Sequence, residues 1–131
     1  MKKGFTLIEL MLVVIIIGVL SAMVMPKLVG RSDQARVQAA KTDIESNLSL
    51  VLDLYEMDMG SFPENMEYLI IRPGGSESWH GPYVKKKKIL DPWGRPYAYK
   101  CPGEHNPDSY DLYSVGKDGQ PGTEDDIKNW E

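Results

Sequence analysis

The sequence predicts an α+β protein in which one long N-terminal helix packs on a small antiparallel sheet. Residues 5–25 form an apolar run whose only polar side chains are Thr6, Glu9 and Ser21. After Pro26 the pattern becomes amphipathic with a helical period, and the C-terminal part alternates short tyrosine-bearing segments with Gly/Pro turns. An apolar helix stripe and the apolar face of a small sheet cover each other, which favours this architecture.

The apolar run predicts a single membrane-spanning helix. About 20 consecutive apolar residues are needed to cross a bilayer, and the run from Phe5 to Met25 meets that length. An ordinary secretory signal has a shorter apolar core followed by a small-residue cleavage site, and no such site follows here. Lys2 and Lys3 predict a cytoplasmic N-terminus by the positive-inside rule, so the C-terminal domain is expected across the membrane.

The helix is expected to continue beyond the membrane and to end at Gly60. Pro26 predicts a kink, because a proline inside a helix removes one backbone hydrogen bond. Beyond it, apolar side chains recur with the spacing of one helix face, which predicts a stripe that packs on the rest of the domain. The stripe consists of Ile44, Leu48, Val51, Leu52 and Tyr55.

The remaining chain predicts a short helix and two strands between turns. A helix of about Glu64–Ile71 is expected, closed by Pro73 and Gly74, and strands are expected in RPYAYKC and SYDLYSVG. Cys101 is the only cysteine, so no intramolecular disulfide can form, and it is expected to be a buried or half-buried small apolar side chain in a strand.

Composition and motifs argue against two functional classes. The formal net charge of −4 disfavours nucleic-acid binding. His80 and His105 lack cysteine partners at metal-binding spacing, and no phosphate loop or catalytic triad pattern appears, so an enzyme is not expected.

The acidic stretch SVGKDGQPGTEDDI is a candidate cation site. Glycines let such a loop curl until carboxylates and carbonyls face one point, and Ca²⁺ takes six to eight oxygen ligands. The spacing is not that of an EF-hand, so a solvated acidic turn balanced by Lys117 and Lys128 is the alternative. The carboxylates are Asp118, Glu124, Asp125 and Asp126.

Glu9 needs an explanation because it lies near the start of the apolar run. A charge at the centre of a bilayer costs about 2.5 to 3.5 kcal/mol on insertion scales, so an intramembrane carboxylate is expected to have a partner or a function. The alternatives are a carboxyl at the headgroup level or a protonated one.

The string GFTLIEL, followed by the apolar run and Pro26, resembles the class III signal of type IV pilins and type II secretion pseudopilins. The resemblance implies that a prepilin peptidase cuts after Gly4 and methylates the new amino terminus of Phe5. The resulting cation would lie one helical turn from Glu9, or within reach of a neighbouring subunit's Glu9, and in low dielectric such a pair attracts strongly.

The resemblance implies four segments. Residues 1–4 are a cleaved leader and residues 5–26 the membrane-spanning part of the helix. Residues 27–59 are its amphipathic periplasmic half, and residues 60–131 form a periplasmic globular domain.

Four further motifs resemble the major pseudopilins of type II secretion along nearly the whole chain: LYEMDMGSFP, GPYVKK, DPWGRPYAY and DLYSVGKDGQPGTEDDIKNW. This likeness implies that the acidic loop binds calcium through the side chains of Asp118, Asp125 and Asp126. The backbone carbonyls of Val115 and Gln120 would complete the shell, and Glu124 is expected to point to solvent. Many type IV major pilins instead carry a cysteine pair.

The implied function is polymerisation into a helical periplasmic filament of a type II secretion system, which helps export folded proteins. The implied partners are further copies of the chain, minor pseudopilins, the prepilin peptidase and an inner-membrane assembly platform. Glu9, Gly18 and Pro26 are the expected assembly residues, and the helix between the last two is expected to extend in the filament. A type IV pilus subunit for adhesion, motility or DNA uptake is one alternative. A plain membrane-anchored binding module, uncut after Gly4 and indifferent to Glu9→Ala, is the other.

Overall fold

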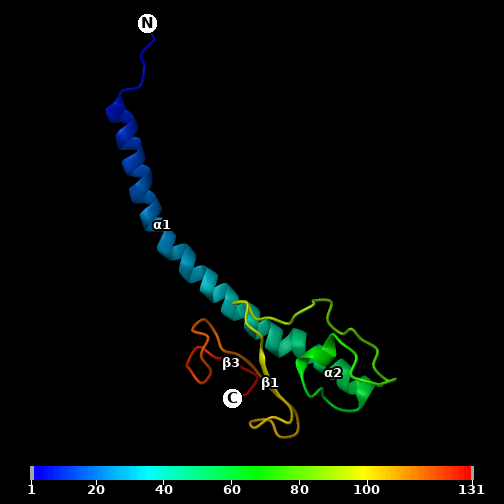
Figure 1. The fold of residues 1–131 in the computed structure, drawn as a ribbon. Coiled ribbons are helices and arrows are strands. Elements are labelled where there is room, and N and C mark those ends of the chain that lie inside the picture. The colour runs from blue at the N-terminus through cyan, green and yellow to red at the C-terminus, as the bar shows by residue number, and fades with distance from the viewer. Residues whose placement is uncertain (1, 131) are drawn as a thin grey trace. The chain divides into compact units, whose positions relative to one another are not determined.

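The computed structural model describes residues 2–130, apart from the side chains of residues 26–29. The chain forms two compact units, Met1–Ala35 and Arg36–Glu131, which are described separately. In chain order (Figure 1), the elements are helix α1 (Leu7–Thr42), π-helix η1 (Asp43–Asn47), helix α2 (Leu48–Met59), 3₁₀-helix η2 (Met66–Leu69), and strands β1 (Ala98–Lys100), β2 (Asp111–Ser114) and β3 (Ile127–Lys128).

The first unit is the apolar part of α1, which begins with a capping box. The Thr6 N–H donates to Glu9 Oε2 at 2.7 Å, and the Glu9 N–H donates to Thr6 Oγ1 at 3.3 Å. The two residues thus satisfy each other's backbone groups at the start of the helix. The helix contains an apolar window of 18 residues, none of them buried, and by length and composition it can cross a membrane.

The predicted kink at Pro26 falls on a segment whose side chains lie outside the described residues. The backbone of α1 is helical from Leu7 to Thr42 and includes this position. Both the kink and the extension from Gly18 to Pro26 on assembly stay predictions.

The second unit is built on the amphipathic part of the helix, and the predicted stripe is confirmed. Ile44, Leu48, Leu52 and Tyr55 are buried, and Val51 is half-buried against them. The predicted end is also confirmed: α2 stops at Met59, and Gly60 closes it in the left-handed conformation at φ 82°.

The π-helical turn η1, Asp43–Asn47, was not expected from the sequence. It adds one residue to a helical turn without breaking the helix. Ile44 within it is 1% exposed, so the widened turn still faces the core.

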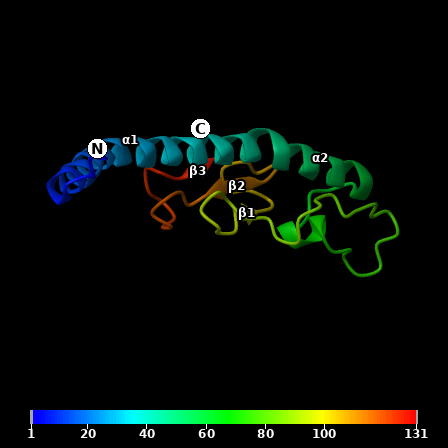
Figure 2. The same cartoon turned by 90° about the horizontal axis from the view of Figure 1, so that it is seen from above.

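A three-stranded antiparallel sheet covers the stripe, in the order β1, β2, β3. Tyr99 pairs with Leu112, and Ser114 pairs with Ile127. Figure 2 shows the three strands gathered along one side of the helix, and Leu112 and Ile127 join its buried cluster. The two predicted strands are present but shorter than expected, and β3 was missed because two residues show no alternation.

The predicted helix of about Glu64–Ile71 is wrong in length and type, since only the 3₁₀ turn Met66–Leu69 forms. Asn65 caps it by accepting the Glu67 N–H at 3.1 Å. Asn65 has an extended backbone, with φ −148° and ψ 160°, so no helix can begin at Glu64, and Leu69 is fully buried in the shared core. The predicted burial of Cys101 is confirmed, because it is half-buried, but it lies just after the end of β1 and not in a strand as predicted.

Asp111 organises the loop between β1 and β2. Its Oδ2 accepts the backbone N–H groups of Glu104 and His105, both at 2.9 Å, and its Oδ1 accepts that of Asn106 at 3.0 Å. The ring Nδ1 of His105 also lies 2.9 Å from Oδ2. Burial alone would raise the pKa of Asp111, but the donors of His105, Asn106 and Glu104 outweigh it and hold that pKa below its usual range.

We expect Asp111→Asn to destabilise the domain by about 2 to 3 kcal/mol, because one amide oxygen cannot satisfy all the buried donors. Thermal melting of the full chain in detergent should show a drop of about 10 °C or more. Asp108→Asn is the matched control, since Asp108 lies in the same loop and is exposed.

The loss should depend on pH. The folded pKa of Asp111 is lowered, so its stabilisation is complete above the unfolded value of about 3.9 and disappears as pH falls through the folded pKa. The melting temperatures of wild type and Asp111→Asn should therefore converge on acidification below about pH 4. A gap that stays constant from pH 7 to pH 3 would contradict the assigned role of the carboxylate.

Candidate metal centre

Residues 115–126 connect β2 to β3, and the pairing of Ser114 with Ile127 holds the two ends of this loop together. The loop folds back on itself at Gly116, whose φ is 68°. A Cβ atom there would lie 2.7 Å from Asp125 Oδ2 and would also meet the Asp125 carbonyl. Only glycine therefore permits the close approach of the loop's first and last residues.

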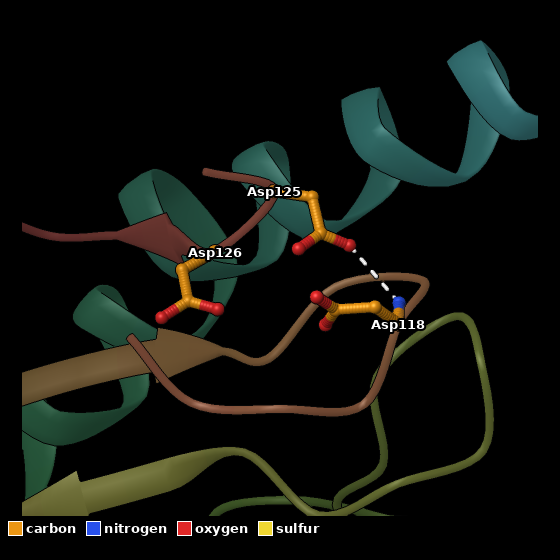
Figure 3. A group of neighbouring side chains, drawn as sticks. All are labelled: Asp118, Asp125 and Asp126. Atoms are coloured by element: carbon orange, nitrogen blue, oxygen red, sulfur yellow. Dashed lines mark hydrogen bonds between the residues drawn. The ribbon is translucent and has the colours of Figure 1, made fainter. Parts of the chain in front are cut away.

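The loop brings the three predicted side-chain ligands together. Carboxylate oxygens of Asp118, Asp125 and Asp126 lie within 4.8 Å of one another. Figure 3 shows the three carboxylates turned toward a common space. Asp118 is exposed and the other two are half-buried, so the cluster is open to solvent on one side.

Backbone N–H groups of the loop orient each carboxylate. Asp125 Oδ2 accepts the Asp118 N–H at 3.0 Å, which is the dashed line in Figure 3. Asp118 Oδ1 accepts the Gln120 N–H at 2.9 Å, and Asp126 Oδ2 accepts the Gly122 N–H at 2.7 Å. Each carboxylate therefore has a fixed position and keeps lone pairs for another ligand.

Thr123 contacts the candidate ligands and was missed by sequence reasoning. Its hydroxyl lies 2.6 Å from Asp125 Oδ1 and 3.3 Å from Asp126 Oδ1, between two of the candidate ligands. The Thr123 hydroxyl and the Asp118 N–H hold the pKa of Asp125 below its usual range, so this carboxylate is ionised at neutral pH. The sequence signal that could have identified Thr123 is its position directly before three consecutive acidic residues.

The donor set fits a hard cation. Three carboxylates gathered in a flexible, glycine-rich loop are ligands that suit Ca²⁺, while zinc sites favour nitrogen and sulfur. The Gln120 carbonyl accepts the Thr123 hydroxyl at 3.2 Å, and its ligand role, like that of the Val115 carbonyl, stays a prediction. Glu124 is exposed, as expected.

The second candidate site is the N-terminal motif. Gly4 has open space around it, and the Phe5 side chain is 86% exposed, so the predicted cleavage point is accessible. Glu9 Oε2 accepts both the N–H and the hydroxyl of Thr6, the latter at 2.9 Å. Sequence reasoning missed Thr6, although the spacing Thr-x-x-Glu is the signature of a capping box.

Two family descriptions match the chain in adjacent segments. Residues 27–130 match the family described as type II secretion system (T2SS), protein G, and residues 1–25 match the prokaryotic N-terminal methylation motif. The boundary between the two matches lies near the end of the apolar run.

Similar proteins cover almost the whole chain. The type II secretion system core protein G of Pseudomonas aeruginosa is 42% identical, over 99% of this chain and 96% of that protein. Its counterpart in Escherichia coli is also 42% identical, over 98% and 91%. The crystal structure of the major pseudopilin from the type 2 secretion system of enterohaemorrhagic Escherichia coli superimposes with a TM-score of 0.65 at 32% identity, covering 79% of this chain and 89% of that one.

Three observations agree on the family of this chain: the long helix under a small antiparallel sheet, the methylation motif, and these matches. They show that the chain belongs to the type II secretion system protein G family and has a type IV pilin-like fold.

Proposed function

We propose that this chain is cut after Gly4, methylated at Phe5 and polymerised into the periplasmic pseudopilus of a type II secretion system, where it helps export folded proteins across the outer membrane. The observation that carries the proposal is the apolar window of α1, none of which is buried within the chain. Such a surface needs a cover, which is lipid before assembly and the same helix of other copies afterwards.

During assembly the apolar window of α1 would move from lipid into contact with other helices, so the amount of apolar surface kept away from water would stay about the same. Because lipid tails are as apolar as leucine side chains, helix association there depends on packing and on polar contacts. The charge pair between Glu9 and the new amino terminus of Phe5 would favour subunits that enter in register. Extension of the helix from Gly18 to Pro26 would adapt its length to the filament.

The subunit would lie in the inner membrane and the periplasm and would meet other proteins of the secretion system there. Residues 5–26 would anchor the precursor in the inner membrane, with residues 27–59 and 60–131 in the periplasm, and residues 1–4 would be lost. The prepilin peptidase, an inner-membrane assembly platform and minor pseudopilins would act on or bind the subunit. A surface pilus subunit is disfavoured, because these relatives of the chain are type II secretion proteins.

We also propose that the acidic loop holds Ca²⁺ through Asp118, Asp125 and Asp126, with the Val115 and Gln120 carbonyls. When bound, the cation would neutralise three crowded carboxylates and fix the loop that links β2 to β3. The support is the convergence of three carboxylates within 4.8 Å in an oxygen-only donor set.

Intact mass and N-terminal sequencing of the membrane-extracted protein should show a chain that starts at methylated Phe5. Gly4→Leu should keep the leader, since the peptidase would no longer recognise its site, while the fold stays intact because nothing lies within 4 Å of a Cβ there. Functional filaments built from chains that still begin at Met1 would contradict the proposal.

Glu9→Gln separates the two roles of this side chain. Glutamine can keep the capping box with Thr6 but carries no charge, so the helix should form and insert normally. The critical concentration for filament formation, measured by sedimentation and cross-linking, should rise at least about tenfold, which corresponds to about 1.4 kcal/mol per assembly step. A wild-type critical concentration for Glu9→Gln would leave capping as the sole role of Glu9.

Saturating Ca²⁺ should raise the melting temperature of the full chain in detergent. At a concentration 100 times the dissociation constant the stabilisation is about 2.7 kcal/mol, or about 10 °C for a domain of this size. Asp125→Asn should abolish this rise. Glu124→Gln, in the same loop but exposed, should preserve it, and an equal loss in both variants would argue against a specific site.

A further inference from the structure

Arg95 lies against the first half of the acidic loop, although 21 residues separate it from Gly116. Its Nη1 donates to the Gly116 carbonyl at 2.9 Å and lies 3.5 Å from that of Lys117. The loop then passes over the guanidinium at Gly119, where a Cβ atom would come within 2.6 Å of Arg95 Cζ. The guanidinium thus contacts the loop backbone from residue 116 to residue 119.

The backbone of Arg95 is itself fixed by a tight turn around Asp91. The Asp91 N–H donates to the Arg95 carbonyl at 2.7 Å, and the Arg95 N–H donates to Asp91 Oδ1 at 2.8 Å. The same oxygen accepts the Trp93 N–H at 3.0 Å, and Asp91 is only 4% exposed. The guanidinium therefore projects from a rigid base.

A second connection joins this turn to the loop. Asp91 Oδ2 accepts the hydroxyl of the fully buried Ser114 at 2.7 Å, and Ser114 Oγ accepts the Gly116 N–H at 3.2 Å. The amide and the carbonyl of Gly116 are thus both bonded to groups that depend on the Asp91–Arg95 turn. Gly116 is also the residue that lies against Asp125, so its position determines where that candidate ligand can sit.

We infer that Arg95 is a positioning residue for the calcium site, holding residues 116–119 in their binding conformation before the metal arrives. The inference rests on the proposed calcium binding of the loop. Arginine is always charged, so its charge alone would repel a cation and weaken binding. Its Nη1, however, donates to the Gly116 carbonyl, and an ordered loop loses less conformational entropy on binding, which strengthens Ca²⁺ binding. Charge repulsion and loop ordering change the Ca²⁺ affinity in opposite directions, so affinity measurements on Arg95 variants show which effect is larger.

The test is a Ca²⁺ titration of the full-length protein in detergent by calorimetry. Arg95→Gln should raise the dissociation constant at least about tenfold. Arg95→Lys should also weaken binding, because an ammonium keeps the charge but cannot replace the flat guanidinium that packs under Gly119. Arg72→Gln is the matched control, since Arg72 Nε donates to the Ser76 carbonyl at 2.6 Å outside the loop. Unchanged or tighter binding by Arg95→Gln would overturn the inference while leaving the calcium site intact. No binding by the wild type would overturn the calcium site and this inference with it.

A glycine pair tests the same contact should Arg95→Gln fail to fold. Gly119 and Gly122 both have positive φ, at 72° and 83°, so alanine strains both, but only Gly119 lies against the guanidinium. Gly119→Ala should weaken Ca²⁺ binding more than Gly122→Ala does. Equal losses with Arg95 present would show that the guanidinium contact does not position the loop.

Discussion

The domain depends on one apolar contact surface, that between the helix stripe and the sheet. Strands of three, four and two residues bury too little surface to be stable alone. They are stable here because Leu112 and Ile127 pack into one cluster with Ile44 and Leu52 of the helix. The helix that supports this core is continuous with the apolar segment.

Because the apolar core is small, buried carboxylates fix the conformation of the turns and loops by hydrogen bonding to their backbone N–H groups. Asp91 orients its turn and Asp111 its loop, each by accepting several backbone N–H groups. Asn129 acts similarly at the end of β3, accepting the Leu112 N–H at 2.9 Å and donating to the Tyr110 carbonyl at 3.0 Å. In the acidic loop three carboxylates share one space, and backbone N–H groups together with the Thr123 hydroxyl orient them.

Periodic and local features were predictable from the sequence, whereas contacts between distant segments were not. The stripe from Ile44 to Tyr55 and the end of the helix at Gly60 follow from spacing and from the preference of glycine for left-handed backbone. The grouping of the three aspartates was predictable only from the resemblance to pseudopilins, and not from their spacing. The position of Arg95 beneath Gly119 depends on how two distant turns pack, which no spacing encodes. The widened turn η1 is likewise a response to tertiary packing, which overrides local propensity.

Glu9 shows how one side chain can be satisfied in its hydrogen bonds and still favour a change of state. Before any cleavage, the Glu9 carboxylate accepts hydrogen bonds from the N–H and the hydroxyl of Thr6, so its Oε2 atom is already hydrogen-bonded at the start of the helix. Both donors are neutral, and the negative charge therefore has no cationic partner in this contact. Under the proposed cleavage a cationic amine appears on Phe5, and the carboxylate has spare lone pairs to accept from it while keeping the cap. The capping box satisfies the hydrogen bonds of Glu9 before cleavage, and under the proposed cleavage its charge would favour the state in which it is paired with the new amine in a low-dielectric environment.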